Sequence, residues 1–333
     1  MRVEEFRYDL PEDRIALYPA QPRDACLLIV VHRDSGRIEH SRFRDIIDYL
    51  KPGDCIVLNE SKVQPVRFRL RRISGGLIEL LFTGKDDGQW IALVRPAKRI
   101  KTKEKLIDER GEEVVEILEI DKGKVRLKLL IEEESLFESL GLAPLPAYIK
   151  RVPEEIDLKT YQAVFARKGF SIAAPTAGLH FTKKLLETIR TKGVQVVYIR
   201  LDVGEGTFRP IKTDKVEDHS MLPENFLITD KAARIINNAK RIIAVGTTVT
   251  RTLESFPEEN GIMPGRRSTD LFIYPGYKFR YVDTLLTNFH QPSSTPLLLT
   301  CAFAGKEMIL EAYRQALGKG YRFLSYGDAM LIL

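Results

Sequence analysis

Hydrophobic and polar positions follow two different patterns along the chain. Before residue 62 and after residue 151, short apolar runs alternate with segments whose apolar residues recur at helical spacing. The runs at residues 27–31, 55–58 and 241–245 are typical of strands buried on both faces. Alternating strands and helices predict an α/β domain with a mostly parallel sheet. Further expected elements include strands at residues 194–199, 271–274, 285–289 and 321–325 and helices at residues 183–191, 230–239, 297–302 and 307–317.

A strict alternation of apolar and polar residues marks the middle of the chain. In Val66-Arg67-Phe68-Arg69-Leu70-Arg71 every second residue is apolar, and further short strands follow between turns. Several short strands with little helix predict a small β-barrel. We therefore expect an inserted β-barrel domain at residues 62–151, within a discontinuous α/β domain of residues 1–61 and 152–333.

The composition narrows the class of protein. No run of about 18 apolar residues occurs, and residues 1–6 lack the apolar core of a signal peptide. We therefore expect a cytoplasmic protein that does not enter a membrane. The three cysteines, Cys26, Cys55 and Cys301, lie far apart among apolar neighbours, which favours reduced, buried thiols. The five histidines show no pair at ligand spacing, so we expect no metal.

Charge is segregated within the predicted barrel. The chain carries a formal net charge of +6, yet residues 62–105 hold 12 Lys and Arg against 4 Asp and Glu, whereas residues 106–155 hold 7 against 13. The basic half favours contact with a polyanion such as RNA. A solvated strand face would give the same pattern. The candidate phosphate contacts are Arg67, Arg69, Arg71, Lys98 and Arg99.

Residues 173–182, Ala-Ala-Pro-Thr-Ala-Gly-Leu-His-Phe-Thr, form an uncharged stretch of mostly small residues with one histidine. Pro175 ends any preceding strand, and Thr182 is a predicted N-cap because apolar residues follow it at helical spacing. Such a loop brings backbone N–H groups, a hydroxyl and an imidazole together around a small polar ligand. The alternative is that His180 is a packed loop residue without a chemical role. The candidate residues are Thr176, Gly178 and His180.

Two further loops follow predicted strands. Gly246-Thr247-Thr248 opens a helix that contains Arg251, and its N–H groups, hydroxyls and guanidinium favour a nucleoside or amino-acid site over a plain turn. Asp202-Val203-Gly204-Glu205-Gly206 places two carboxylates beside glycines, which suits ribose hydroxyls or the work of a base. An acidic surface turn is the alternative for this second loop.

The C-terminal part adds aromatic and amide groups. Residues 274–280, Tyr-Pro-Gly-Tyr-Lys-Phe-Arg, offer a stacking platform with cations for single-stranded nucleic acid. Packing of these aromatic rings in the core is the alternative. Asn288 and His290 follow with polar groups able to recognise the edge of a base. The candidate residues of the aromatic turn are Tyr274, Tyr277, Lys278 and Arg280.

Long motifs spread over nearly the whole chain resemble one family, the S-adenosylmethionine:tRNA ribosyltransferase-isomerases of queuosine biosynthesis. Tyr8-Asp9-Leu10-Pro11 is similar to the family opening. Motifs of this length at these separations are highly specific. The longest are residues 174–182 (APTAGLHFT), 244–255 (AVGTTVTRTLES), 269–280 (TDLFIYPGYKFR), 285–290 (LLTNFH) and 325–331 (SYGDAML).

The resemblance implies an enzyme that transfers and isomerises the ribosyl part of S-adenosylmethionine. The acceptor would be 7-aminomethyl-7-deazaguanine at the wobble position of tRNA, and the products would be epoxyqueuosine-tRNA, adenine and methionine. S-adenosylmethionine would be a co-substrate, with no metal and no tightly bound cofactor. The implied fold is an α/β domain with an inserted β-barrel, in agreement with the pattern above.

The implied chemistry assigns roles to the candidate residues. The 5′ carbon of the ribose is made weakly acidic by the adjacent sulfonium, so a base must be held against it in a dry site. His180 is the first candidate, and Asp202 and Glu205 are the second because a carboxylate also stabilises the sulfonium. For the remaining contacts we expect Thr247, Thr248 and Arg251 at the methionine carboxylate or ribose, Tyr274 and Tyr277 on adenine or the modified base, and Asn288 and His290 at a base edge.

The chain departs from the common family pattern at three places, one of which is Asn59-Glu60-Ser61-Lys62 in place of the usual Asn-Asp-Thr-Arg. Asp202 stands where the family commonly has a histidine, and Ser220 and Leu222 stand where histidines often occur. A general catalytic role for those histidines is therefore not expected. Two other classes of function stay open: an S-adenosylmethionine-dependent RNA methyltransferase, which would release S-adenosylhomocysteine, and a non-catalytic RNA-binding module.

Overall fold

The computed structural model describes residues 1–208 and 210–333, and the chain divides into two compact units. The first unit comprises residues 1–62, 147–151 and 162–333, and the second comprises residues 63–146 and 152–161. The chain enters the second unit at Val63, beside the predicted start of the insertion at residue 62. It returns to the first unit twice, at Ala147 and at Gln162.

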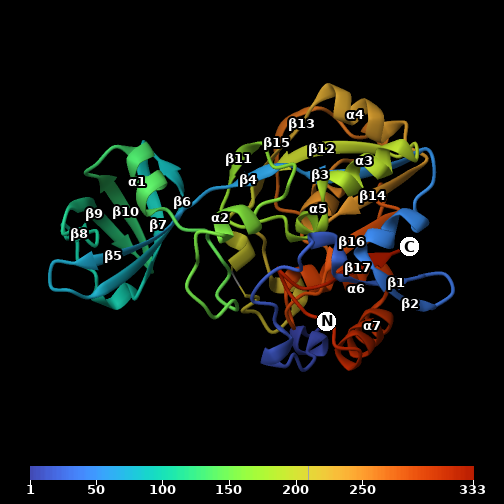
Figure 1. Ribbon diagram of the computed structural model, residues 1–333, viewed down its shortest axis with the longest axis horizontal. Helices are drawn as coiled ribbons and strands as arrows, with labels where there is room; N and C mark the ends of the chain where they lie inside the picture. The colour runs from blue at the N-terminus through green and yellow to red at the C-terminus, as the bar shows by residue number, and fades with distance from the viewer. Residues whose placement is uncertain (209) are drawn as a thin grey trace. The chain divides into compact units, whose positions relative to one another are not determined.

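A nine-stranded sheet forms the centre of the first unit (Figure 1). Its four central strands are mutually parallel, whereas the pairings outside them are antiparallel except for the parallel pair of β1 and β17. The α/β prediction is confirmed, and the parallel part is the centre of a mixed sheet. In spatial order the strands are β15 (Gly265–Thr269), β13 (Glu224–Ile228), β12 (Gln195–Leu201), β3 (Asp54–Asn59), β14 (Arg241–Val245), β16 (Thr284–Asn288), β17 (Ala329–Ile332), β1 (Leu27–Val31) and β2 (Ile38–Arg42).

The central strands are buried on both faces, which explains their unbroken apolar runs. Every residue of β3 is buried, and its side chains alternate between two hydrophobic clusters, with Val57 in one and Ile56 in the other. In register, Val57 lies opposite Ala244 of β14, and Ala244 lies opposite Leu285 of β16. This parallel register brings the carboxyl ends of the central strands to the same edge of the sheet.

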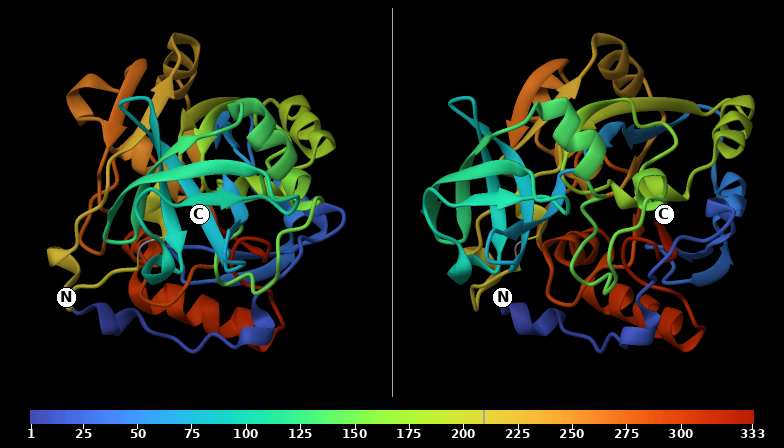
Figure 2. Two further views of the ribbon diagram at one scale, coloured as in Figure 1. Left: turned by 90° about the vertical axis from the view of Figure 1, so that its left-hand side faces the viewer. Right: turned by 60° about the vertical axis from the view of Figure 1, so that its left-hand side comes forward.

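Helices cover both faces of this sheet. α3 (Lys183–Thr191) and η4 (Phe43–Tyr49) bury apolar residues in one cluster. The other cluster receives α4 (Asp230–Asn237), α5 (Thr247–Glu254), α6 (Thr295–Ala304) and α7 (Lys306–Gly318). Figure 2 shows the start of the chain beside α7, where Lys306 Nζ lies 3.4 Å from Glu5. No helix within the described residues is long and apolar enough to cross a bilayer.

Short 3₁₀ helices connect the elements of the first unit, and a two-stranded sheet joins two of its loops. The sheet pairs β4 (Ser61–Val63) with β11 (Lys168–Ser171). The remaining 3₁₀ helices of this unit are η1 (Val3–Phe6), η2 (Glu12–Arg14), η3 (Arg23–Ala25), η6 (Thr176–His180), η7 (Glu205–Phe208), η8 (Val216–Asp218) and η9 (Glu258–Asn260).

The second unit is a closed six-stranded β-barrel, as the alternating pattern predicts. In β5 (Arg67–Arg72), Phe68 and Leu70 are buried while Arg69 and Arg71 are exposed. Phe137 of α1 (Glu133–Leu140) adds a ring 5.4 Å from that of Phe68. The other elements are β6 (Leu77–Asp86), β7 (Gln89–Arg95), η5 (Ala97–Arg99), β8 (Lys105–Ile107), β9 (Glu113–Asp121), β10 (Lys124–Leu129) and α2 (Asp157–Thr160).

Two strand predictions are wrong, and several strands lack a prediction, β17 among them. Residues 271–274 form no strand; the Leu271 carbonyl instead accepts a hydrogen bond of 2.9 Å from Arg251 Nε. Residues 321–325 make a single isolated bridge, between Phe323 and Ile15. The strand near this end is β17, a buried run of four residues that pairs on both sides. A run this short carries too little periodicity to be distinguished from a buried helix segment.

Candidate active site

Loops predicted to carry chemistry meet the carboxyl edge of the parallel strands. β12 ends at Leu201 and leads into Asp202, β14 ends at Val245 and leads into Gly246, and β16 ends at Asn288. In open α/β sheets, ligands bind outside this edge. We therefore take the edge from β12 to β16 as the candidate active site.

The loop that carries His180 forms η6 and packs against this edge. A side-chain carbon at Gly246 would lie 3.6 Å from Cβ of Ala177, and the φ of Gly246 is +89°, which favours glycine at this turn. A side-chain carbon at Gly178 would lie 2.9 Å from the ring of Phe165, so the loop is tightly seated. Thr182 caps α3 through a hydrogen bond of 3.1 Å to a backbone N–H, and this prediction is confirmed.

His180 is buried, with 4% of its surface exposed, and both ring nitrogens have neighbours. Its Nε2 lies 2.9 Å from Nδ2 of Asn288, and its Nδ1 lies 3.2 Å from Sγ of Cys26. The Asn288 amide also donates to the Leu324 carbonyl at 3.3 Å, which supports this orientation of the amide. Because an amide nitrogen only donates, Nε2 is the acceptor and the ring proton resides on Nδ1.

The environment of His180 opposes protonation. Burial, together with the positive charges of Arg322 and Arg23, lowers the pKa of His180 to about 3. A group with such a low pKa is a weak proton acceptor. In this conformation His180 orients Asn288, and Nε2 can abstract a proton only after the Asn288 amide moves away.

Near β14 and β16, two buried oxygen atoms have no hydrogen-bond partner among the described residues. They are Oδ1 of Asn288 and Oγ1 of Thr248. Burying an unpaired polar atom costs about 1–3 kcal/mol, so a ligand that donates a hydrogen bond there recovers that free energy. Both atoms belong to predicted substrate-binding residues. Thr176 and Thr247 are half-buried at the starts of η6 and α5 and contribute two more hydroxyls.

Asp202 lies after β12, at the other end of the edge. Its Oδ1 accepts hydrogen bonds from Ser61 Oγ at 2.5 Å and from Phe170 N at 3.0 Å. Gly169 permits this close approach, because a side-chain carbon there would lie 2.4 Å from Asp202. Glu205 begins η7 and is half-buried. Across residues 1–208 and 210–333, no group of three or more His, Cys, Asp or Glu side chains is placed to hold a metal ion.

Arg251, predicted to bind a carboxylate or ribose, is committed to partners within the protein. It is 8% exposed, lies 2.5 Å from the Glu224 carboxylate and donates from Nε to the Leu271 carbonyl at 2.9 Å. Glu224 also accepts a hydrogen bond of 3.0 Å from the backbone of Gly204. The pair thus ties α5 to the turn between Asp202 and Glu205.

The aromatic turn at residues 274–280 is anchored by Glu254, which is fully buried. The Glu254 carboxylate accepts from Arg280 N at 2.9 Å and from the Tyr277 hydroxyl at 3.3 Å. Burial and the nearby charge of Glu254 raise the pKa of Tyr277. Tyr274 is half-buried in the same turn and Lys278 is exposed. The hydroxyl of Tyr277 therefore has an internal partner, whereas Lys278 faces solvent.

His290 follows β16 and also has internal partners. Its Nε2 lies 2.8 Å from Thr287 Oγ1, and its backbone N donates to the Tyr313 hydroxyl at 3.0 Å. Burial lowers the pKa of His290 to about 3, so the ring is neutral near pH 7. Because Nε2 already has a partner, Nδ1 is the ring nitrogen that would make the predicted contact with a base edge.

The basic residues predicted to contact tRNA from the barrel differ in exposure. Arg67 is half-buried and donates to the Leu145 carbonyl at 2.7 Å, and burial lowers its pKa. Arg69 and Arg71 are exposed on β5, and Lys98 and Arg99 are exposed on η5. The exposed four are accessible to a phosphate, whereas Arg67 serves the barrel's own backbone.

Three buried residues shape this region without a functional prediction from the sequence: Cys26, Glu224 and Glu254. Cys26 lies 154 positions from its neighbour His180, and its apolar surroundings in sequence carry no signal of that contact. Glu254 lies within the motif at residues 244–255, and Glu224 lies in the stretch that departs from the family pattern. Because both carboxylates lie in stretches that the family comparison had already singled out, their position was the available signal of a role at this site.

Comparisons with known proteins match this chain over nearly its full length. The family model described as "Queuosine biosynthesis protein" matches residues 3–332. An S-adenosylmethionine:tRNA ribosyltransferase-isomerase from Moorella thermoacetica is 47% identical over 344 residues, and one from Thermotoga petrophila is 46% identical over 341, each covering 100% of both chains. A crystal structure of S-adenosylmethionine tRNA ribosyltransferase from Thermotoga maritima covers 99% of this chain and 100% of its own, with a TM-score of 0.56 and 38% identity. The resemblance seen in the motifs is confirmed: this chain belongs to the S-adenosylmethionine:tRNA ribosyltransferase-isomerase family of queuosine biosynthesis.

Proposed function

We propose that this chain transfers and isomerises the ribosyl moiety of S-adenosylmethionine onto 7-aminomethyl-7-deazaguanine at the wobble position of tRNA. The reaction yields epoxyqueuosine-tRNA and releases adenine and methionine. S-adenosylmethionine is a co-substrate consumed in each turnover rather than a resident cofactor. The full-length match to relatives with this enzyme name supports the proposal.

The observation that carries the proposal is the series of polar loops along one edge of the parallel strands. Neighbouring strands lie about 4.8 Å apart, so the three spacings from β12 to β16 span roughly 14 Å. Carboxylates lie at the β12 end, and the buried acceptors of Asn288 and Thr248 lie at the β16 and β14 ends. An elongated ligand with adenosine at one end and methionine at the other suits such an edge.

The candidate proton acceptors lie toward opposite ends of this edge. His180 lies beside Asn288 at the β16 end, and the carboxylates of Asp202 and Glu205 follow β12. The 5′ carbon of S-adenosylmethionine lies beside the sulfonium, near the middle of the ligand, so it cannot contact both ends at once. Asp202 or Glu205 is favoured as the base, because a carboxylate also stabilises the adjacent sulfonium. His180 then acts by holding Asn288, and it serves as the base only if that amide moves.

The other polar groups bind and orient the substrates. Oδ1 of Asn288 and Oγ1 of Thr248 accept hydrogen bonds from amino or hydroxyl groups of the ligand, such as the exocyclic amine of adenine. Arg251 acts on the substrate through Glu224 and the acidic turn. The remaining proposed contacts are Thr176, Gly178, Gly246, Thr247, Tyr274, Tyr277 and His290.

The tRNA contacts are proposed from exposed cations. Arg69, Arg71, Lys98 and Arg99 of the barrel, with Lys278 of the aromatic turn, meet phosphates through a salt-sensitive attraction. Arg67 supports the barrel from within, and Arg280 holds the aromatic turn through Glu254. The five exposed cations set the affinity for tRNA rather than the rate of the chemical step.

One incubation tests the proposal. The protein is mixed with S-adenosylmethionine labelled in its ribose and with tRNA that carries 7-aminomethyl-7-deazaguanine. The expected result is label in the tRNA together with equal amounts of adenine and methionine, with a metal chelator present throughout. Formation of S-adenosylhomocysteine would indicate a methyltransferase, and tRNA binding without turnover would indicate an RNA-binding module. Either result overturns the proposal.

A further inference from the structure

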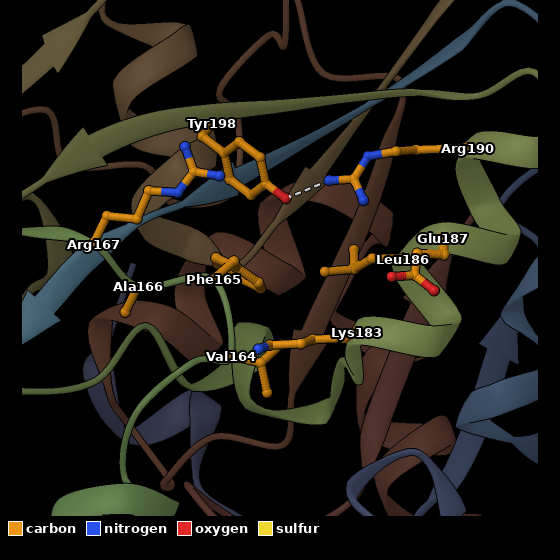
Figure 3. A pocket seen from close by; sticks show the side chains of 9 residues that line it. All are labelled: Val164, Phe165, Ala166, Arg167, Lys183, Leu186, Glu187, Arg190 and Tyr198. Atoms are coloured by element: carbon orange, nitrogen blue, oxygen red, sulfur yellow. Dashed lines mark hydrogen bonds between the residues drawn. The ribbon is translucent and has the colours of Figure 1, made fainter.

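A groove beside α3 carries positive charge that the candidate active site does not use. It has a volume of about 260 Å³ and is lined by residues 164–167, by one side of α3 and by Tyr198 of β12 (Figure 3). Phe165 and Leu186 give it an apolar floor. Three cations, Arg167, Lys183 and Arg190, and one anion, Glu187, are exposed around it, and Arg167 Nε also lies 4.0 Å from the Glu60 carboxylate.

Tyr198 holds two of these cations in place. Arg190 Nη2 donates to the Tyr198 hydroxyl at 2.7 Å, and the guanidinium carbon of Arg167 lies 5.2 Å from the centroid of the ring. Figure 3 shows Arg167 reaching across the ring from one side and Arg190 meeting the hydroxyl from the other. Since a guanidinium has five N–H donors, Arg190 keeps donors for a ligand after bonding to Tyr198. Two guanidinium groups held in this way are suited to bind an anion with little loss of side-chain entropy.

The groove shares a wall with the loop that carries His180. A side-chain carbon at Gly178 would lie 2.9 Å from the Phe165 ring, and the rings of Phe165 and Phe181 are 6.4 Å apart. Lys183 opens α3 immediately after the capping residue Thr182. An anion in the groove therefore lies beside η6, which packs against the candidate active site.

We propose that this groove binds a phosphodiester of the tRNA substrate, with Arg167 and Arg190 as its ligands and Lys183 as a supporting charge. The inference rests on the proposed function, because it takes tRNA as the substrate. The planar guanidinium fork matches phosphate oxygens, and RNA supplies phosphates at every nucleotide. A wobble nucleotide that enters the active site brings its neighbours past η6, and the groove offers charge of opposite sign beside that loop.

Two single substitutions test the groove against a matched control. Arg167→Gln and Arg190→Gln are each expected to raise the KM for tRNA about fivefold and to lower the slope of log KM against log salt by about 0.7–0.9. The kcat and the KM for S-adenosylmethionine stay as in the wild type. Lys184→Gln is the control, because Lys184 is exposed on the same helix, next to Lys183, but does not line the groove. It is expected to leave the KM for tRNA unchanged.

Three further variants separate a phosphate ligand from a general charge effect. Glu187→Gln removes the anion of the groove and is expected to lower the KM for tRNA. Tyr198→Phe keeps the ring but removes the hydroxyl that holds Arg190, so a smaller rise than in Arg190→Gln is expected. Arg190→Lys keeps the charge and loses the fork, so it is expected to restore only part of the affinity.

Several results would overturn the inference. Unchanged KM and salt slope in both arginine variants, with normal wild-type turnover, would exclude the groove and leave the proposed function intact. An equal rise in Lys184→Gln, or a rise in the KM for S-adenosylmethionine instead, would also exclude it. If the wild type releases no adenine, the proposed function fails; tRNA binding by fluorescence anisotropy then tests the groove, and equal Kd values for wild type and variants exclude it. Unchanged thermal unfolding of the variants shows that their fold is intact.

Discussion

Two buried polar clusters near the carboxyl edge of the sheet differ in how fully their hydrogen bonds are satisfied. In the first, His180 and Asn288 are uncharged, and Oδ1 of Asn288 has no partner among the described residues. In the second, Arg251 and Glu224 are charged, and each also bonds to the backbone. Buried groups whose capacity is used hold the fold, whereas a buried group with capacity left is available to a ligand. The comparison separates framework residues from binding residues.

The largest effect is expected from breaking the charged cluster. Arg251→Met leaves the Glu224 carboxylate buried without its cation and is expected to lower the free energy of unfolding by about 3–5 kcal/mol, measured by urea titration. The double variant Arg251→Met with Glu224→Gln should recover part of this loss, because no unpaired charge remains. A stable Arg251→Met protein with weak S-adenosylmethionine binding would instead make Arg251 a substrate ligand.

The next largest effect concerns the base. Asp202→Asn keeps an acceptor for Ser61 and Phe170 but removes the negative charge, and it is expected to lower the rate of adenine release about 100-fold at saturating substrates. His180→Ala is expected to raise the KM for S-adenosylmethionine more than it lowers kcat, because it releases Asn288. If His180→Ala abolishes turnover while Asp202→Asn does not, the histidine is the base and the uncharged cluster performs the chemistry.

A third prediction uses the low pKa of His180 and His290, about 3 in each case. In the unfolded chain a histidine binds its proton below about pH 6.5, whereas the folded chain does so only near pH 3. Stability from each residue is therefore full above pH 6.5 and is lost as the pH falls toward 3, by about 1.4 kcal/mol per pH unit. Urea unfolding from pH 7 to pH 4 should show a shallower dependence in His180→Gln. An unchanged dependence would mean that the ring is not held neutral.

Features that depend on local physics follow from the sequence alone. The unbroken apolar run at residues 55–58 predicts a strand covered on both faces, and β3 is such a strand. The alternation from Val66 to Arg71 predicts a barrel strand, and β5 buries Phe68 and Leu70. Thr182 is recognisable as a cap because a cap depends on residues only three positions away. Residue type and spacing are sufficient in these cases.

Partnerships between distant positions do not follow from residue type. From sequence alone, an arginine that pairs with an internal carboxylate cannot be told from one that binds a substrate carboxylate. Glu224, the partner of Arg251, lies 27 positions away along the chain. In the same way, the histidine spacing does not reveal that Cys26 and Asn288 occupy the two ring nitrogens of His180. The segment at residues 271–274 has the composition of a strand, yet its Leu271 carbonyl serves Arg251. Such tertiary partners decide the roles.

The smallest effects are expected on one barrel strand, β5, where framework and binding residues can again be compared. Arg67 is half-buried and bonded to the Leu145 carbonyl, whereas Arg69 and Arg71 are exposed two and four positions later. Arg67→Gln is expected to lower the free energy of unfolding by about 1 kcal/mol, since the carbonyl loses its donor. Arg69→Gln and Arg71→Gln should each change stability by less than about 0.5 kcal/mol and raise the KM for tRNA about twofold, with a larger rise at low salt than at high salt. If Arg67→Gln weakens tRNA binding without loss of stability, burial does not distinguish framework cations from binding cations in this barrel.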